Sequence, residues 1–315
     1  MSGRWVRRAA QRTEDAAYLA AHGVSRPLSR EAQREAERDG TRGGAAPRAG
    51  GRLQPGPTGL EDPAVRGEHA APPKPFSARE LKRVYDALLA QHGEQQWWPT
   101  AATEGSEQRL EICLGAILTQ NTSWRGAATA LTNLREAGML SCAAIVALPE
   151  DVLGDLVRPS GHYRVKARKL QSFCGTVIEE HGGDIDALLA GDTETVRARL
   201  LRIWGVGPET ADAMTLYAGR LPTFVVDAYA YRLFERLGHP PGERRYDVYR
   251  EYFTRMIGTA EDDVWALNEW HALIVRHGQR ICRKTQPLCG ECALLDRCPF
   301  GQEQAGAKPP RRKVR

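Results

Sequence analysis

Four cysteines near the C-terminus have the spacing of a metal site. Cys282, Cys289, Cys292 and Cys298 form a C-x6-C-x2-C-x5-C pattern. Thiolates suit zinc or an iron–sulfur cluster. A zinc site built from four cysteines usually pairs two C-x2-C units, and only one is present here, so the spacing favours [4Fe–4S], with zinc as the alternative. We expect a structural role, because the spacing implies no redox chemistry.

A glycine turn in front of a predicted helix is the second candidate site, in the stretch 200–227, LLRIWGVGPETADAMTLYAGRLPTFVVD. Gly205 and Gly207 permit a tight turn, and Pro208 fits the first turn of a helix. Backbone N–H groups of such a turn and the positive end of the helix dipole together form an anion site. An ordinary helix–helix turn is the alternative.

Asp227 is a single acid between an apolar run and a predicted helix, 228–237. A carboxylate at this place can simply cap the helix. Burial would raise its pKa, and the helix start would lower it.

Aromatic and polar residues gather in two further segments. Trp97, Trp98 and Pro99 follow the first predicted helix, and the two indoles either line a pocket or cover a helix end. The loop 119–124, TQNTSW, joins two apolar helices. It either only caps the second helix or also meets a hydrogen-bonding ligand, on which Trp124 can stack.

Helices must position all of these residues. Apolar residues recur at helical spacing and no strand-like alternation occurs, so we predict an all-α fold of roughly ten helices joined by short turns. Ser77 and Glu80 predict a capping box at the first helix. The other predicted helices are 107–118, 125–136, 143–157 with a break near Pro149, 164–180, 184–190, 193–202, 228–237, 246–257 and 262–277.

Charge and composition divide the chain of 315 residues, whose net charge is +5. Residues 1–76 are rich in Arg, Ala, Gly and Pro and lack apolar periodicity, which predicts a disordered tail. They hold 13 Lys or Arg and 9 Asp or Glu, whereas residues 77–307 hold 26 basic and 30 acidic residues. The basic balance therefore comes from the tails, which add phosphate affinity but do not establish nucleic-acid binding.

Membrane and secreted classes are disfavoured. No apolar run is long enough to span a membrane, and the N-terminus lacks the apolar core of a signal peptide. Seven cysteines with one tight group argue against a secreted disulfide framework and for a reducing compartment. Cys113, Cys142 and Cys174 are expected in the core.

Taken in order, the LTQNT loop, the LLRIWGVGPETAD hairpin, the VVD acid and the cysteine loop resemble the endonuclease III superfamily of helix–hairpin–helix DNA glycosylases. The resemblance covers about residues 77–300. It implies a base excision repair enzyme with a [4Fe–4S] cluster and two helical lobes, 101–221 and 77–100 plus 222–300, followed by a basic tail, 301–315. It also implies a monomer, cytoplasmic and nucleoid-associated if bacterial, that flips the damaged base of double-stranded DNA into a cleft.

The resemblance also assigns roles to residues. The amides of Gly205 and Gly207 would hold a phosphate, with a monovalent cation bound at the hairpin. Gln120 would fill the gap left in the duplex, and Asp227 would be the catalytic aspartate. The implied DNA-binding set is Gln120, Asn121, Gly205, Gly207 and Thr210.

Glu209 is the main departure from endonuclease III, which carries a Schiff-base lysine two residues after the second glycine. Without that amine no imine with the sugar can form there. Lys166 and Lys169 lie elsewhere in the sequence, and nothing in the pattern gives them this role. We therefore predict a monofunctional glycosylase that leaves an abasic site, with weak or absent lyase activity.

Among branches without this lysine, adenine glycosylases carry a catalytic glutamate where this chain has Gly115, and an extra C-terminal domain that this chain lacks. The closer resemblance is to the branch that removes alkylated purines such as 3-methyladenine, through Trp97-Trp98-Pro99, Trp124 and residues 205–212. Electron-poor, often cationic purines bind an aromatic slot by stacking and cation–π attraction. The alternatives are a bifunctional glycosylase/lyase for oxidised pyrimidines and a non-catalytic protein that binds damaged DNA.

Overall fold

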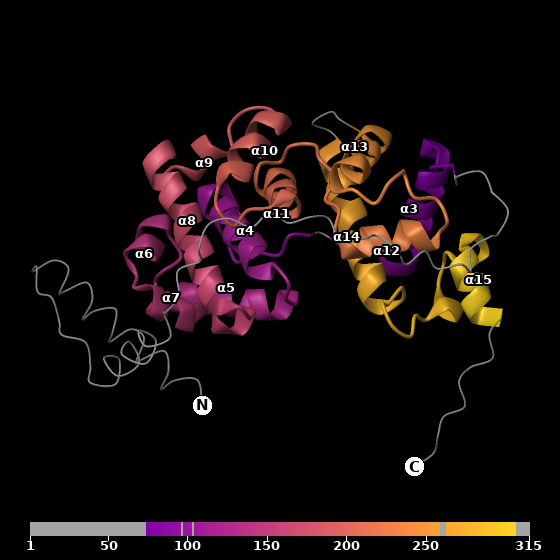
Figure 1. The fold of residues 1–315 in the computed structure, drawn as a ribbon, viewed down its shortest axis with the longest axis horizontal. Helices are drawn as coiled ribbons and strands as arrows, with labels where there is room; N and C mark the ends of the chain where they lie inside the picture. The colour runs from indigo at the N-terminus through magenta and orange to yellow at the C-terminus, as the bar shows by residue number, and fades with distance from the viewer. Residues whose placement is uncertain (1–73, 96, 103, 259–262, 307–315) are drawn as a thin grey trace, which may run out of the picture. The chain divides into compact units, whose positions relative to one another are not determined.

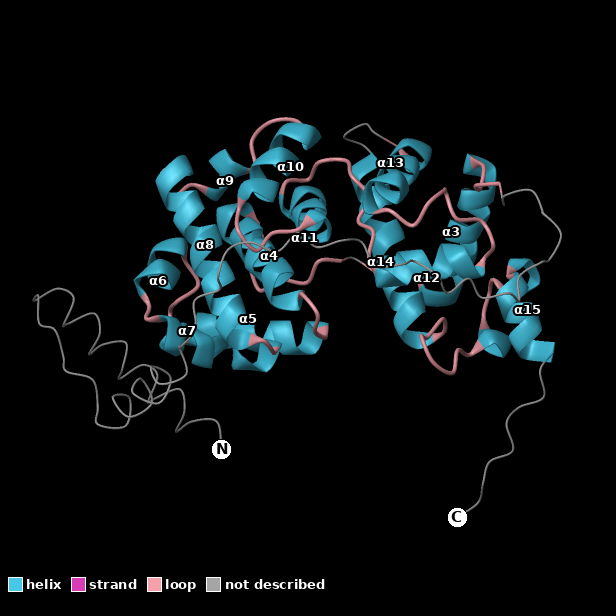
Figure 2. Cartoon of the chain, in the orientation of Figure 1, coloured by secondary structure: helices cyan, strands magenta, loops and turns pink. Residues whose placement is uncertain are grey.

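Helices make up the regular structure of the chain, and among the described residues there is no strand (Figures 1 and 2). The computed structural model describes residues 74–95, 97–102, 104–258 and 263–306. Most of the predicted tails therefore lies outside the described residues. The longer helices are α3 (Ala78–His92), α4 (Gly105–Thr119), α5 (Trp124–Glu136), α6 (Cys142–Ala147), α7 (Glu150–Val157), α8 (Tyr163–His181), α9 (Ile185–Leu188), α10 (Thr193–Arg202), α11 (Pro208–Ala213), α12 (Ala228–Arg236), α13 (Tyr246–Ile257), α14 (Val264–Arg280) and α15 (Pro299–Gly306).

Short helical turns also occur between the helices. They are η1 (Arg158–Ser160), the π-helical turn η2 (Met214–Ala218), η4 (Cys289–Glu291) and η5 (Leu295–Arg297). The all-α prediction is confirmed, and the helix starts follow from local side chains. Ser77 and Glu80 form the expected capping box, in which the Glu80 carboxylate accepts from Ser77 N at 2.7 Å. Ser123 caps α5 by accepting from Gly126 N.

Neighbouring helices bury a continuous apolar core. In the first part of the chain α4 packs against α5, α8 and η2, and α8 also packs against α6 and α7. Later, α14 packs against α12 and α13, and it lies beside α3 from the start of the described chain (Figure 1). Phe76, which composition assigned to the tail, is buried, and its ring centroid lies 6.4 Å from that of Phe234. The packed chain thus includes the last residues of the predicted tail.

A buried ion network fixes α11, the helix behind the glycine turn. Asp212 on α11 is fully buried and accepts from Arg197 Nε at 3.1 and 3.2 Å and from Thr223 Oγ1 at 2.9 Å. Arg250 on α13 lies 3.7 Å from the same carboxylate. Burial raises the pKa of Asp212, and the two arginines oppose this shift. Because loss of one partner would leave a buried charge uncompensated, the network resists movement of α11 against α10 and α13.

The contact between α12 and α14 depends on a glycine. A Cβ on Gly278 would lie 2.3 Å from Tyr229 Cδ1 and 2.9 Å from Tyr229 Cβ. We expect Gly278→Ala to lower the free energy of unfolding by about 1–3 kcal/mol, because overpacking outweighs the better helix propensity of alanine. Denaturant unfolding measures this change.

Gly175 in α8 is a matched control, because a Cβ there would meet nothing within 4 Å. Gly175→Ala should leave stability unchanged or raise it by up to about 1 kcal/mol, the difference in helix propensity. Equal effects of the two substitutions would contradict the role given to Gly278.

Candidate active site and cysteine loop

The glycine turn lies between α10 and α11 and requires glycine at one of its two positions. Gly205 has φ +91°, and a Cβ there would lie 2.5 Å from Lys169 Cγ. Gly207 has φ −94°, which any residue adopts, and a Cβ there would meet nothing within 4 Å. The prediction that both glycines shape the turn therefore holds for Gly205 and is wrong for Gly207. The space around Gly207, in front of the first N–H groups of α11, is open.

Gln120, at the end of α4, ties the polar loop to this turn. Its Nε2 donates to Gly205 O at 3.0 Å and to Thr210 Oγ1 at 2.9 Å. Its Oε1 accepts from Lys169 Nζ at 2.5 Å. Gln120 would have to give up these three bonds to fill a gap in a duplex. In the free chain it holds the turn, and buried Thr210 acts as one of its partners.

Asn121 is exposed at the tip of the same loop. Its φ of +53° is left-handed, a conformation that asparagine adopts more readily than most residues. The loop is closed by the bond from Thr122 N to Thr119 O at 3.1 Å. Asn121 thus presents its amide to solvent next to Gln120 and the glycine turn.

Lys166 is a structural residue. Its ammonium group is buried and donates to Leu118 O at 2.7 Å and to Ser160 O at 2.6 Å. Burial is the main cause that lowers the pKa of Lys166 to about 8, and the charge of Lys169 adds to it. Both carbonyls close off the amine, so Lys166 joins α4 to the η1 turn and is not accessible as a nucleophile.

Asp227 is the N-cap of α12, as one of the two interpretations of the sequence proposed. Its Oδ1 accepts from Ala230 N at 2.8 Å, and the residue is 9% exposed. Its Oδ2 lies 3.7 Å from Nε2 of His271 on α14. The cap uses only one carboxylate oxygen, so the second oxygen remains oriented toward His271.

Glu209 shares the electrostatic environment of Asp227. It is the second residue of α11 and lies at the exposed mouth of the site. Desolvation of the carboxyl is the main cause that raises the pKa of Glu209 to about 7. The negative charge of Asp227 adds to this shift, and His271 opposes it. The site therefore holds two carboxyl groups, of which Glu209 is partly protonated near neutral pH.

His271 and Tyr217 complete this group, and sequence reasoning did not single them out as functional. The Tyr217 hydroxyl lies 2.5 Å from His271 Nδ1, and both side chains are buried. Burial, together with nearby carboxylates, raises the pKa of Tyr217 well above its ordinary value. The only sequence signal was a histidine within the apolar stretch that became α14.

Four aromatic rings form a cluster beside this group. The ring centroid of Trp98 lies 5.4 Å from that of Trp97, 5.2 Å from that of Trp124 and 5.1 Å from that of Tyr217. The tryptophans predicted to form a base pocket therefore come together, although Trp124 belongs to a different segment of the sequence from Trp97 and Trp98. Through Tyr217 and its bond to His271, the cluster is joined to the group around Asp227.

Gly115 on α4 makes room for this cluster. A Cβ there would lie 3.4 Å from atoms of the Trp98 indole. Trp98 thus covers the helix at Gly115, while each tryptophan of the cluster keeps part of its surface exposed and Pro99 is exposed beside them. Trp98 therefore acts as a helix cover, one of the two interpretations of the Trp-Trp pair, and the base pocket stays a prediction.

Known proteins share this arrangement of elements. A family model described as "HhH-GPD superfamily base excision DNA repair protein" matches residues 114–257. The chain is 40% identical over 219 residues to a provisionally named DNA repair glycosylase of Methanocaldococcus jannaschii, which covers 69% of this chain and 95% of that protein. The chain belongs to the HhH-GPD superfamily of base excision DNA repair glycosylases.

Two solved structures have the fold of this glycosylase. A trapped covalent complex of endonuclease III with DNA superimposes with a TM-score of 0.60 at 21% identity, covering 73% of this chain and 99% of that chain. The 3-methyladenine DNA glycosylase of H. pylori, bound to 1,N6-ethenoadenine, superimposes with a TM-score of 0.55 at 25% identity, covering 65% and 98%. These likenesses support the fold, and the family match with the 40% identical relative confirms the predicted superfamily.

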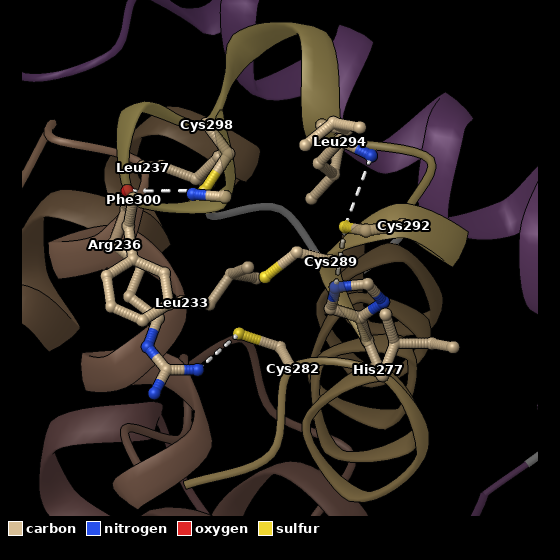
Figure 3. A pocket seen from close by; sticks show the side chains of 13 residues that line it. Leu233, Arg236, Leu237, His277, Cys282, Cys289, Cys292, Leu294, Cys298 and Phe300 are labelled. Atoms are coloured by element: carbon tan, nitrogen blue, oxygen red, sulfur yellow. Dashed lines mark hydrogen bonds between the residues drawn. The ribbon is translucent and has the colours of Figure 1, made fainter. Parts of the chain in front are cut away.

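The four cysteines of the glycosylase line one cavity, together with apolar side chains such as Leu233, Leu294 and Phe300 (Figure 3). Among the described residues, no group of His, Cys, Asp or Glu is arranged to hold a single metal ion. Thiols spread around a cavity are consistent with an iron–sulfur cluster, as the resemblance implies.

Donors already point at these sulfur atoms. Arg236 donates to Cys282 Sγ at 3.3 Å, Leu294 N to Cys292 Sγ at 3.4 Å and Gly301 N to Cys298 Sγ at 3.3 Å. Hydrogen bonds to the sulfurs are a common feature of iron–sulfur sites. The donor set and its surroundings therefore fit such a cluster.

Helix α12 connects the cysteine loop with Asp227. From its later turns, Arg232 donates to Cys282 O at 2.8 Å and to Gly278 O at 3.1 Å. Arg236 donates to Arg283 O at 2.8 Å and to Lys284 O at 3.2 Å. Asp227 caps the first turn of the same helix, so the loop and the acid share one support. Within the described part of the glycosylase, no helix has the length and apolarity needed to cross a membrane.

The raised pKa of Glu209 predicts a pH dependence of stability. Its pKa in the folded state, about 7, lies above the ordinary value of 4.5. The folded chain therefore holds this proton more tightly, and the associated stability is lost as the pH rises through about 7. We expect the melting temperature of Glu209→Gln, measured relative to that of the wild type, to increase as the pH rises from about 5 to about 8.

Asp227→Asn provides the matched test, since asparagine caps helices as well as aspartate does. Removal of this neighbouring charge should move the pH transition of Glu209 downward. Melting curves across this pH range measure both effects, and parallel profiles of wild type and Glu209→Gln would refute the assignment.

Proposed function

We propose that this glycosylase is monofunctional and removes alkylated purines from double-stranded DNA, with water as the nucleophile. The observation that carries the proposal is the position of Asp227 Oδ2, 3.7 Å from His271 Nε2, in a group that Tyr217 joins to an aromatic cluster. Asp227 would stabilise the cationic sugar or orient the water that attacks it. Its second oxygen remains available for that task because only Oδ1 caps α12.

The chemistry of the nearby side chains supports base removal without strand cleavage. A carboxyl at Glu209 cannot form an imine with the sugar. Lys166 is buried against two carbonyls, and Lys169 donates to Gln120 and packs against Gly205. Both amines are thus engaged in structural contacts, Lys166 between α4 and η1 and Lys169 at the glycine turn.

The aromatic cluster supports an alkylated purine as the substrate. Trp97, Trp98 and Trp124 are each partly exposed, and aromatic rings attract electron-poor or cationic rings. The 3-methyladenine DNA glycosylase of H. pylori has the same fold and binds 1,N6-ethenoadenine. A cationic purine leaves as a neutral base, so little acid catalysis is needed.

The hairpin supports phosphate binding in this proposal. The open space before Gly207 would let a phosphate approach the first N–H groups of α11, with a monovalent cation beside it. The exposed amide of Asn121 lies next to this place. DNA would run across a cleft between two lobes, 101–221 and 77–100 plus 222–300, with the damaged nucleotide flipped toward Asp227.

A [4Fe–4S] cluster is the proposed cofactor, held by Cys282, Cys289, Cys292 and Cys298. When bound, it would supply covalent anchoring of the C-terminal loop rather than a redox step. The arginines of α12 would offset the negative charge of its thiolates. The cluster would thereby support the helix that carries Asp227.

Base release from methylated DNA tests the proposed reaction. Purified chain should release 3-methyladenine or a related purine, identified by mass, and leave abasic DNA. Asp227→Asn should lower the single-turnover rate by about a hundredfold or more while DNA binding is retained, because the cap survives but the negative charge is lost.

Three other outcomes would contradict the proposal. Release of only an oxidised pyrimidine would refute the substrate, and a strong borohydride-trapped adduct with abasic DNA would establish a bifunctional lyase. If the wild type binds damaged DNA but releases no base from it, a non-catalytic binding protein would be favoured.

Iron and sulfide analysis tests the cofactor. Anaerobically purified protein should contain about four iron and about four acid-labile sulfide ions per protein chain. Cys292→Ser should lose most of both. Cys142→Ala, a buried cysteine outside the loop, is the matched control and should retain them. Stoichiometric zinc without sulfide would contradict the assignment.

A further inference from the structure

The imidazole of His271 has one nitrogen in use and one without a partner. Nδ1 lies 2.5 Å from the hydroxyl of Tyr217. Nε2 is buried and has no hydrogen-bond partner among the described residues. His271 as a whole is only 7% exposed. Since unsatisfied buried polar atoms are rare and costly, a partner from substrate or solvent is expected at Nε2.

The surroundings determine which nitrogen carries the proton. Tyr217 retains its phenolic proton, because burial raises its pKa, and it can donate to Nδ1. A neutral imidazole that accepts at Nδ1 carries its proton on Nε2. A lone pair on Nε2 would instead face the negative Oδ2 of Asp227, which is unfavourable. Both arguments place a proton on Nε2, so that an Nε2–H group points toward Asp227.

The distance between the two groups suits one shared oxygen atom. Nε2 and Oδ2 are 3.7 Å apart, too far for a direct hydrogen bond. A water about 2.8 Å from each atom would accept from Nε2–H and donate to Oδ2. We propose that His271 is a positioning residue that, together with Asp227, holds the water that attacks the sugar, and this inference rests on the proposed function.

The reaction balances with this arrangement. The water oxygen forms a bond to C1′ of the flipped nucleotide, and its proton passes to Oδ2 of Asp227. The bond between C1′ and the base nitrogen breaks, and its electron pair goes to the base. A cationic alkylated purine then departs neutral. His271 keeps its proton throughout, and Tyr217 holds the ring in the orientation that aims Nε2–H at the water.

Two conservative substitutions separate this role from a merely structural one. Glutamine places an amide nitrogen near the position of Nε2, whereas asparagine places its polar atoms near Nδ1, within reach of Tyr217. If His271 positions water, His271→Gln should be about tenfold slower than the wild type and His271→Asn about a hundredfold slower in single-turnover base release. Both should bind DNA carrying a non-hydrolysable damaged nucleotide with Kd within about threefold of the wild type. If His271 serves only to anchor Tyr217, the order of the two rates should reverse.

Tyr217→Phe is a second probe, because it removes the donor to Nδ1 and retains the ring of the aromatic cluster. It should slow base release without weakening DNA binding, since the proton of His271 would no longer be held on Nε2. Melting temperatures of all variants identify any that fail to fold. If the wild type releases base and His271→Asn is as fast as His271→Gln, only the inference on His271 fails. If the wild type releases no base from any damaged DNA, the proposed function fails and the inference with it.

Discussion

The hydrogen bond from Ala230 N to Asp227 Oδ1 starts helix α12 and at the same time determines where Oδ2 lies. Capping and catalysis are often treated as alternative explanations of an acid at a helix start. Here the cap needs a single acceptor, so Oδ1 caps the helix and Oδ2 is left for the catalytic role proposed above. The geometry of the site therefore depends on a helix start as much as on the residues that line it.

The opposite end of α12 is held just as firmly. Arg232 and Arg236 bind four carbonyls of α14 and the cysteine loop, and Arg236 also contacts a cysteine sulfur. These bonds add to the packing of α12 against α14 in fixing the direction of the helix. The loop far from Asp227 in sequence is thereby linked to the acid through one rigid element. This link gives the proposed cluster a structural role in supporting α12.

Local signals made much of the fold predictable from sequence. Ser77 and Ser123 marked helix starts, Pro149 marked a break, and the cysteine spacing marked one cavity. Residues whose role depends on distant partners were beyond such signals. Gln120 binds the turn across 85 residues of sequence, and the roles of His271 and Tyr217 exist only because α14 packs against η2. Gly207 was misjudged because its pattern suggested strain where the backbone has none.

The contact between Gly115 and Trp98 limits which side chains position 115 can hold. A β-carbon there would meet the indole and Leu131 at 3.4 Å, which is an ordinary contact, but a longer side chain would enter the volume that these residues fill. A carboxylate at this position would therefore require the tryptophan to move. The packing around one glycine thus restricts which acids this part of the molecule can acquire.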